Sequence, residues 1–168
     1  MTDLKGFIIH QLRELRREML AALDGLSDEE LTSHEPNLRN PIAWIVQHCC
    51  LNVDFFINKG IRGELFLQHA PNFLARPSPT PKPGDPYPSG AELRDRWSKL
   101  LDAGATALEG LTAEQLQQPS CCARNKEPLV ESCLRVINHQ NAHLRQIWCI
   151  LGRRRRDDKW PRQETWLA

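Results

Sequence analysis

Apolar residues recur along four stretches of the chain at steps of three and four residues. This spacing places apolar side chains on one face of an α-helix that packs against a core. It predicts helices over residues 3–23, 40–59, 89–111 and 128–151, and no segment predicts a convincing strand. In the first helix the predicted core face consists of Leu4, Ile8, Leu12, Leu15, Met19 and Leu23.

Capping residues predict where these helices begin and end. Asn40 is a good N-cap and Pro41 suits a first helical position, so the second helix is expected to begin there. Gly60 and Gly152 are predicted to end the second and fourth helices, because glycine commonly follows a helix. Capping boxes predict two short helical turns and the start of the third long helix. These boxes are Ser27–Glu30, Thr112–Gln115 and, for the long helix, Ser89–Glu92.

The segment from residue 63 to residue 88 is rich in proline. Proline in a helix interior removes a backbone hydrogen bond, and a central strand excludes it for the same reason. A long surface connection of this kind joins helices that run the same way or covers a site. The sequence therefore predicts an all-α fold, a four-helix bundle with a long proline-rich crossover between its second and third helices. The prolines are Pro71, Pro77, Pro79, Pro81, Pro83, Pro86 and Pro88.

Composition narrows the classes of function. The 168 residues fit one domain, and 22 basic against 21 acidic residues leave a formal charge of +1. With so small a net charge, no overall electrostatic field attracts the chain to nucleic acid or to an anionic membrane. No apolar run approaches the roughly 18 residues of a membrane span. Residues 4–15 lack the continuous apolar core of a signal peptide, so we expect a cytoplasmic protein. Reduced thiols are expected, because Cys49-Cys50 and Cys121-Cys122 are adjacent pairs that make poor structural disulfides.

Three histidines are the strongest candidates for chemistry. On a helical projection, His48 shares an arc of about 60° with Trp44, Leu51 and Phe55. A protonated imidazole on that apolar face would be costly, so the ring must be neutral and either hydrogen-bonded or coordinated. On the fourth helix His139 and His143 are four residues apart and therefore share one face. Apolar side chains lie on either side of this face. These side chains are Val136, Ile147 and Ile150.

Imidazoles from two facing helices can bind one divalent metal ion. Three protein ligands leave a coordination position open for water or substrate, as catalytic metal sites do. Imidazole suits Zn, Ni, Cu or Fe, so ligand type alone does not select the metal. Spacing alone also leaves open that His48, His139 and His143 only satisfy hydrogen bonds in the core. Gln140 stands where a zincin motif has its glutamate base, which disfavours a zinc-protease mechanism.

Other polar residues are weaker candidates. His10 and His34 have no partner at ligand spacing, and His10 lies opposite the apolar stripe, where solvent is expected. His69 could approach the metal site only if the crossover folded over it. Cys49 points about 100° away from its neighbour His48 around the helix, so coordination by both is not expected. The run Arg153–Arg156 is followed by two aspartates and is interpreted as a solvated helix exit.

Two segments resemble the DinB/YfiT-like family of metal-binding four-helix bundles. The first segment is Leu26–His48, with its Asn-Pro helix start, and the second is Val136–Gly152, with His-x3-His followed three residues later by Gln146. The resemblance covers residues 3–152 and implies an up-up-down-down bundle with a three-histidine metal site. That site maps onto His48, His139 and His143. Gln146 is interpreted either as a residue that supports a ligand or faces the substrate, or as an ordinary polar edge of the bundle.

The resemblance also implies a function. Some members of this family transfer small-molecule thiols such as bacillithiol or mycothiol to electrophiles, and others are suspected hydrolases. We therefore expect a metal-dependent thiol S-transferase, with a hydrolase, or a metal-binding or sensing module without turnover, as the alternatives. Zn and Ni are the first candidates for the metal, followed by Fe and Mn, and the expected partner is a low-molecular-weight thiol rather than nucleic acid or a membrane.

The chain is expected to divide into a bundle domain, residues 1–152, and a polar C-terminal tail, residues 153–168. Trp160 and Trp166 are large apolar groups in this tail. They are expected to cover either the bundle itself or a second subunit, and the second case would make a homodimer.

Overall fold

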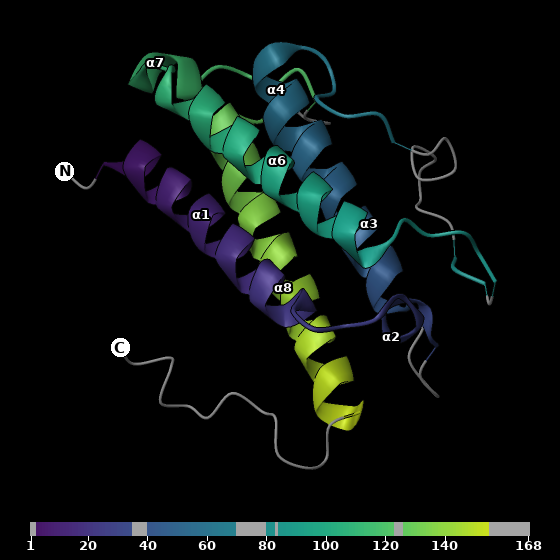
Figure 1. The fold of residues 1–168 in the computed structure, drawn as a ribbon. Coiled ribbons are helices and arrows are strands. Elements are labelled where there is room, and N and C mark those ends of the chain that lie inside the picture. The colour runs from purple at the N-terminus through teal and green to yellow at the C-terminus, as the bar shows by residue number, and fades with distance from the viewer. Residues whose placement is uncertain (1–2, 35–39, 70–79, 83, 123–125, 155–168) are drawn as a thin grey trace.

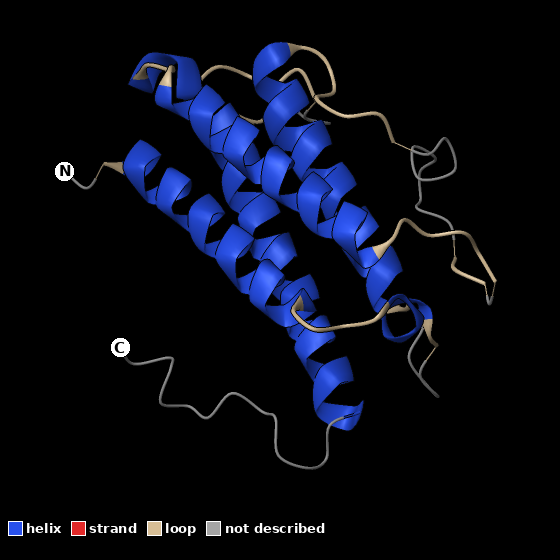
Figure 2. Ribbon diagram, viewed as in Figure 1, coloured by secondary structure: helices blue, strands red, loops and turns tan. Residues whose placement is uncertain are grey.

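The computed structural model describes residues 3–34, 40–69, 80–82, 84–122 and 126–154, and its four long helices pack together (Figure 1). Within these residues the regular structure is helical, apart from one isolated bridge between Pro119 and Pro128 (Figure 2). The predicted all-α fold with four main helices is therefore confirmed. The long helices are α1 (Leu4–Leu23), α3 (Ile42–Val53), α6 (Gly90–Glu109) and α8 (Leu129–Arg154). Shorter elements are α2 (Asp28–Thr32), the π-helical segment η1 (Asp54–Asn58), α4 (Lys59–Arg62) and α7 (Ala113–Leu116).

The core lies between the four long helices. α1 packs mainly against α6 and α8, and α3 packs against the same two helices, so α1 and α3 are diagonal in the bundle. Every long helix contributes side chains with no exposed surface, among them Leu12, Val46, Trp97 and Ile147. The predicted apolar stripe of α1 is buried from Ile8 onwards, whereas Leu4 at its start is 42% exposed.

α1 and α6 run in opposite directions. Near the start of α1, Lys5 Nζ donates to Leu111 O, just beyond the end of α6, at 2.9 Å. At the other end of the pair, Arg94 Nη1 near the start of α6 donates to Leu23 O, the last residue of α1, at 3.1 Å. The C-terminal end of each helix therefore lies beside the N-terminal end of the other.

α6 runs parallel to the helical stretch formed by α3, η1 and α4. Asn58 Nδ2 donates to Leu100 O at 3.2 Å, and Arg62 Nη2, one turn later, donates to Ala103 O at 3.4 Å.

α8 is antiparallel to α3. At one end Gly60 in α4 lies beside Leu129 at the start of α8. At the other end Ile45 near the start of α3 lines one pocket with Ile150 near the end of α8. The helix order is therefore up-down-down-up (Figure 1), and the predicted up-up-down-down order is wrong. The short connection through α2 turns the chain back on itself, and the long crossover joins the parallel pair, as a long connection is expected to do.

The second long helix begins and ends later than predicted. Pro41, not Asn40, is the N-cap of α3, and the helical stretch continues through Gly60 to Arg62. It ends at Gly63, whose φ of 85° is the left-handed conformation that favours glycine. Gly60 has a different role, because a Cβ atom there would lie 3.0 Å from Ser120 Oγ. Its missing side chain lets the turn before α8 approach closely.

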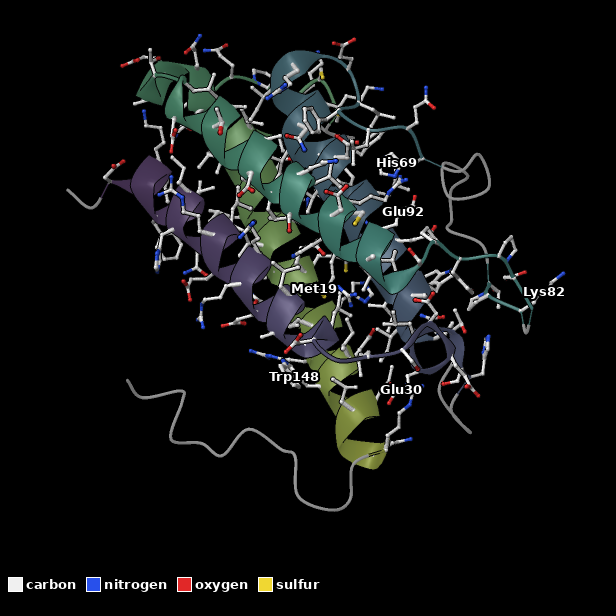
Figure 3. The ribbon with its side chains drawn as sticks, in the orientation of Figure 1. Met19, Glu30, His69, Lys82, Glu92 and Trp148 are labelled. Atoms are coloured by element: carbon white, nitrogen blue, oxygen red, sulfur yellow. The ribbon has the colours of Figure 1, made fainter. Side chains whose placement is uncertain are left out.

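The fourth helix also continues beyond its predicted end. α8 passes through Gly152 to Arg154, whose guanidinium donates to the carbonyl of Glu30 (labelled in Figure 3) and, at 2.7 Å, to Ser33 Oγ. Arg154 therefore ties the end of α8 to α2, and its interpretation as solvated is wrong, whereas Arg153 is exposed as expected. The remaining predicted tail, including Trp160 and Trp166, lies outside the described residues.

Two of the three predicted capping boxes are complete. Ser27 and Thr112 each accept a hydrogen bond from the backbone three residues later, and the Glu30 and Gln115 side chains return a bond to the cap. At Ser89 only the first of these bonds forms, from Glu92 N at 3.2 Å. All three predicted helix starts are thus confirmed.

The crossover between α4 and α6 is described only in part. Residues 64–69, 80–82 and 84–88 adopt no regular structure. The crossover prolines Pro71, Pro77, Pro79 and Pro83 lie outside the described residues. Among the helices that the structure describes, none has the length and apolar character needed to cross a membrane.

Candidate metal centre

The antiparallel packing of α3 and α8 brings three histidines together. His48 lies on α3, and His139 and His143 lie one turn apart on α8. His139 Nε2 is 3.2 Å from His48 Nε2 and 3.2 Å from His143 Nε2. All three side chains are partly buried. The histidines that the helical pattern singled out therefore form one cluster.

The cluster fits a divalent metal ion. A zinc ion binds imidazole nitrogens at about 2.0–2.1 Å, so two such nitrogens on a tetrahedral ion are roughly 3.3 Å apart. The two observed separations of 3.2 Å agree with this value, and the three ligand atoms all lie within 4.8 Å of one another. Three converging nitrogen lone pairs also repel one another unless a cation or a proton lies between them. Within the described parts of the chain this is the one group of three such side chains.

Gln146 sets the tautomer of His143. The Nδ1 of His143 is 2.9 Å from Gln146 Oε1, a carbonyl oxygen that can only accept, so this nitrogen carries the proton. The Nε2 of His143 then keeps its lone pair and faces His139. Gln146, predicted to support a ligand or to face the substrate, contacts the histidine directly. The structure leaves its role in metal binding as a prediction.

His48 is held by two neighbours on its own helix. The ring of Trp44 stacks on it with centroids 5.0 Å apart and an interplanar angle of 7°. Asn52 Nδ2 donates to His48 O at 2.9 Å and lies 3.2 Å from His48 Nε2. A donor at that distance requires a lone pair on Nε2, the form that binds a metal. Asn52 was not predicted as part of the site, although its position four residues after His48 places both on one face.

Burial keeps the α8 histidines neutral. Desolvation, followed by the proximity of His143 and Arg135, lowers the pKa of His139 to about 4. Desolvation also lowers the pKa of His143, and its hydrogen bond with Gln146 opposes that shift. Neutral rings near pH 7 are ready to coordinate. His139 Nδ1 is buried and has no hydrogen-bond partner within the described residues, so no contact there fixes the tautomer of this ring.

A pocket of about 290 Å³ lies beside the cluster. Gln146 lines this pocket and also contacts His143, whereas none of the three histidines is part of the described lining. Asn40 and Ile45 line it from the start of α3, and Arg145 lines it from α8. Entry of the substrate beneath the proline-rich crossover stays a prediction, because much of the crossover lies outside the described residues.

The other predicted histidines lie away from the cluster. His10 is exposed, as predicted. His69 (labelled in Figure 3) follows α4, and its Nε2 is 2.8 Å from Asp54 Oδ2. Asp54 is fully buried and also accepts hydrogen bonds from Phe66 N and Leu67 N. His69 therefore helps to anchor the start of the crossover on η1 and does not join the metal ligands.

The cysteines do not join the cluster either. Cys49 is completely buried and points about 100° away from His48 around α3, and burial raises the pKa of its thiol well above the usual range. Cys121 and Cys122 lie in the turn before α8, with their Sγ atoms 3.6 Å apart and no bond between them. All six thiols are free, as expected for reduced cysteines.

Comparison with known proteins identifies the family. Residues 11–147 match the DinB superfamily, and this range includes His48, His139 and His143. A search of curated proteins found no significant match. The expected resemblance to DinB proteins is confirmed, because the match covers most of the 168 residues. The chain belongs to the DinB superfamily.

Proposed function

We propose that this protein binds one divalent metal ion through His48, His139 and His143 and transfers a low-molecular-weight thiol to an electrophile. The observation that carries the proposal is the convergence of three histidine side chains, with two Nε2–Nε2 separations of 3.2 Å, next to a pocket. A site closed by a fourth protein ligand would be structural, whereas three ligands beside a pocket leave room for a substrate.

The described residues have separate roles in the proposed site. Each histidine would supply one nitrogen ligand, Trp44 stacks on the ring of His48, and Gln146 fixes the tautomer of His143. A bound ion would supply the charge that lowers the pKa of a coordinated thiol towards 7. Zn and Ni suit a set of imidazoles and one thiolate best, and Fe and Mn are the further candidates.

The alternative functions use the same cluster. A hydrolase would need a base to activate water, and the group of metal-binding side chains in the described residues contains no carboxylate. That composition favours the thiol, whose ordinary pKa of about 8.5 needs less assistance. A metal-binding or sensing module without turnover would bind the ion but leave the pocket without a reacting substrate.

Metal analysis tests the site. Protein stripped with a chelator and then loaded with Zn or Ni is expected to hold one ion per chain after desalting. His48→Ala and His143→Ala should each lose most of this binding, while His10→Ala, a change at an exposed histidine, should retain it. Wild-type protein that remains metal-free after loading would overturn the site.

A substrate panel tests the activity. Low-molecular-weight thiols, including bacillithiol and mycothiol, are each mixed with a set of electrophiles, and thioether formation is followed by mass spectrometry. We expect turnover by metal-loaded wild type and its loss in His143→Ala. Hydrolysis of an electrophilic ester without thioether would favour the hydrolase, and metal binding with neither product would favour the sensing module.

A further inference from the structure

The pocket beside the histidines is small and is lined by both apolar and polar side chains. Its volume of about 290 Å³ is at the lower end for small-molecule sites, so it suits a compact ligand. Ile45, Ala142 and Ile150 provide an apolar part of the lining, and Asn40 and Arg145 provide polar groups.

Arg145 is a basic residue of the pocket lining. It is exposed, and among the described residues its guanidinium takes part in no ion pair and no hydrogen bond. Two other arginines of the same helix have partners, since Arg135 pairs with Glu127 and Arg154 binds the end of α2. Arg153 is exposed like Arg145 but does not line the pocket. An unpaired guanidinium at a pocket is suited to a planar anion, because its N–H groups form a fork that matches a carboxylate.

Two amides in the lining also retain bonding capacity. Gln146 uses its Oε1 for His143 Nδ1, which leaves the two N–H groups of its amide nitrogen for an occupant. The Oδ1 of Asn40 is buried, and it has no hydrogen-bond partner in the described part of the chain. An amide oxygen only accepts, so Asn40 Oδ1 can bind a donor group of the occupant, such as a thiol S–H, and not its carboxylate.

We propose that this pocket binds a carboxylate group of the small-molecule thiol, with Arg145 as the anion-binding residue and the Gln146 amide as a second donor. This inference rests on the proposed function and names its substrate class: a short thiol that carries a carboxylate. Because Gln146 contacts both His143 and the pocket, a ligand held at Arg145 has its other end within one side chain of the histidines. The apolar lining contacts the carbon chain between the two ends.

The first test uses metal-free protein, so it does not depend on the metal site. Butanoate, butanamide and inorganic phosphate are titrated separately, and the side-chain amide signals of Gln146 and Asn40 and the Arg145 Nε signal are followed by NMR. Butanoate is expected to shift these signals at lower concentration than the other two compounds. Equal responses to butanoate and butanamide would overturn the inference, and a stronger response to phosphate would overturn the assignment to a carboxylate.

The second test uses zinc-loaded protein and calorimetry. 3-Sulfanylpropanoate is compared with 3-sulfanylpropanamide, which has the same thiol but no charge. Because Arg145 is exposed, we expect the acid to bind about threefold to fivefold more tightly, as for ion pairs near solvent. In Arg145→Gln this preference should vanish while the affinity for the amide is retained.

Arg153→Gln is the matched control, since Arg153 is an exposed arginine of the same helix that does not line the pocket. This variant should keep the preference for the acid. An unchanged preference in Arg145→Gln, or an equal loss in both variants, would overturn the role of Arg145. If zinc-loaded wild type bound neither thiol, the proposed function would fail, and the butanoate titration would still decide the pocket.

Discussion

Gln146 Oε1 accepts a hydrogen bond from His143 Nδ1 at 2.9 Å, and the same glutamine side chain lines the neighbouring pocket. The contact assigns the proton of His143 to Nδ1 and leaves Nε2 facing His139. One residue thereby couples the ligand geometry of the cluster to the space where a substrate would lie.

Replacing Gln146 with leucine is therefore expected to weaken metal binding. Without the acceptor, His143 can rotate and can carry its proton on Nε2. We expect about a tenfold loss of zinc affinity, the lower end for partners of metal-binding histidines. Competition with a chromophoric chelator measures it. Gln146→Glu keeps an acceptor at the same position and should retain the wild-type affinity or exceed it, and a loss of equal size there would contradict the mechanism.

Asp54 is expected to matter for stability and not for metal content. Its buried carboxylate accepts hydrogen bonds from Phe66 N at 2.8 Å and Leu67 N at 2.9 Å and contacts His69 at 2.8 Å. Asp54→Ala leaves these groups without their acceptor, so we expect the free energy of unfolding to fall by about 3 kcal/mol. Urea denaturation measures this loss.

Asp102 provides the control for that measurement. It pairs with Arg16 at 3.2 Å, but its side chain is 59% exposed. Asp102→Ala should therefore change the free energy of unfolding by less than about 1 kcal/mol. Both variants should bind one zinc ion per chain, and a metal-free Asp54→Ala protein that is still folded would show that Asp54 supports the site after all.

The six thiols are expected to react in two groups of three. Cys49, Cys50 and Cys133 are buried, and burial raises the pKa of Cys50 and of Cys133 to about 12. Titration of the native protein with a disulfide reagent at pH 8 should modify about three thiols quickly, and all six after denaturation. The fast group consists of Cys121, Cys122 and Cys149.

Cys149→Ser tests the assignment of the fast group, because this thiol lines the pocket. The variant should lose one fast-reacting thiol. A native protein in which all six thiols react at one rate would contradict the buried positions of Cys49, Cys50 and Cys133.

The stability of the metal-free protein should depend on the protonation of His139. Its pKa is lowered to about 4 in the folded state, whereas an unfolded histidine titrates near 6.5. Between these values the unfolded chain binds more protons than the folded one, so the free energy of unfolding falls as the pH drops from 6.5 to 4. This contribution is fully present above pH 6.5.

Urea titrations at several pH values would measure this dependence. His139→Gln removes the titrating group and should make the fall between pH 6.5 and 4 shallower. An identical pH dependence in the variant and the wild type would show that other groups account for it. Carboxylates that protonate below pH 5 affect both proteins alike, so the difference between the two curves isolates His139.

Helical periodicity was sufficient to locate the long helices and to place His48 and the pair His139 and His143 on inward faces, because both depend on residues only a few positions apart. The same spacing could have indicated Asn52, four residues after His48. Helix ends were less well predicted. Gly60 and Gly152 resemble helix stops, but neither ends its helix. Gly60 allows a close approach to Ser120. Helix α8 continues past Gly152 to Arg154, which binds the end of α2.

The sequence by itself determined the helices, their capped starts and which three imidazoles face the core, since these follow from local backbone geometry and the burial of apolar side chains. Only the tertiary structure decided the up-down-down-up order, the contact of His69 with Asp54 and the pocket that Arg145 and Gln146 share with Asn40. Each of these depends on which helix lies beside which and in what direction. Packing between segments far apart in the chain determines that, and no short-range pattern records it.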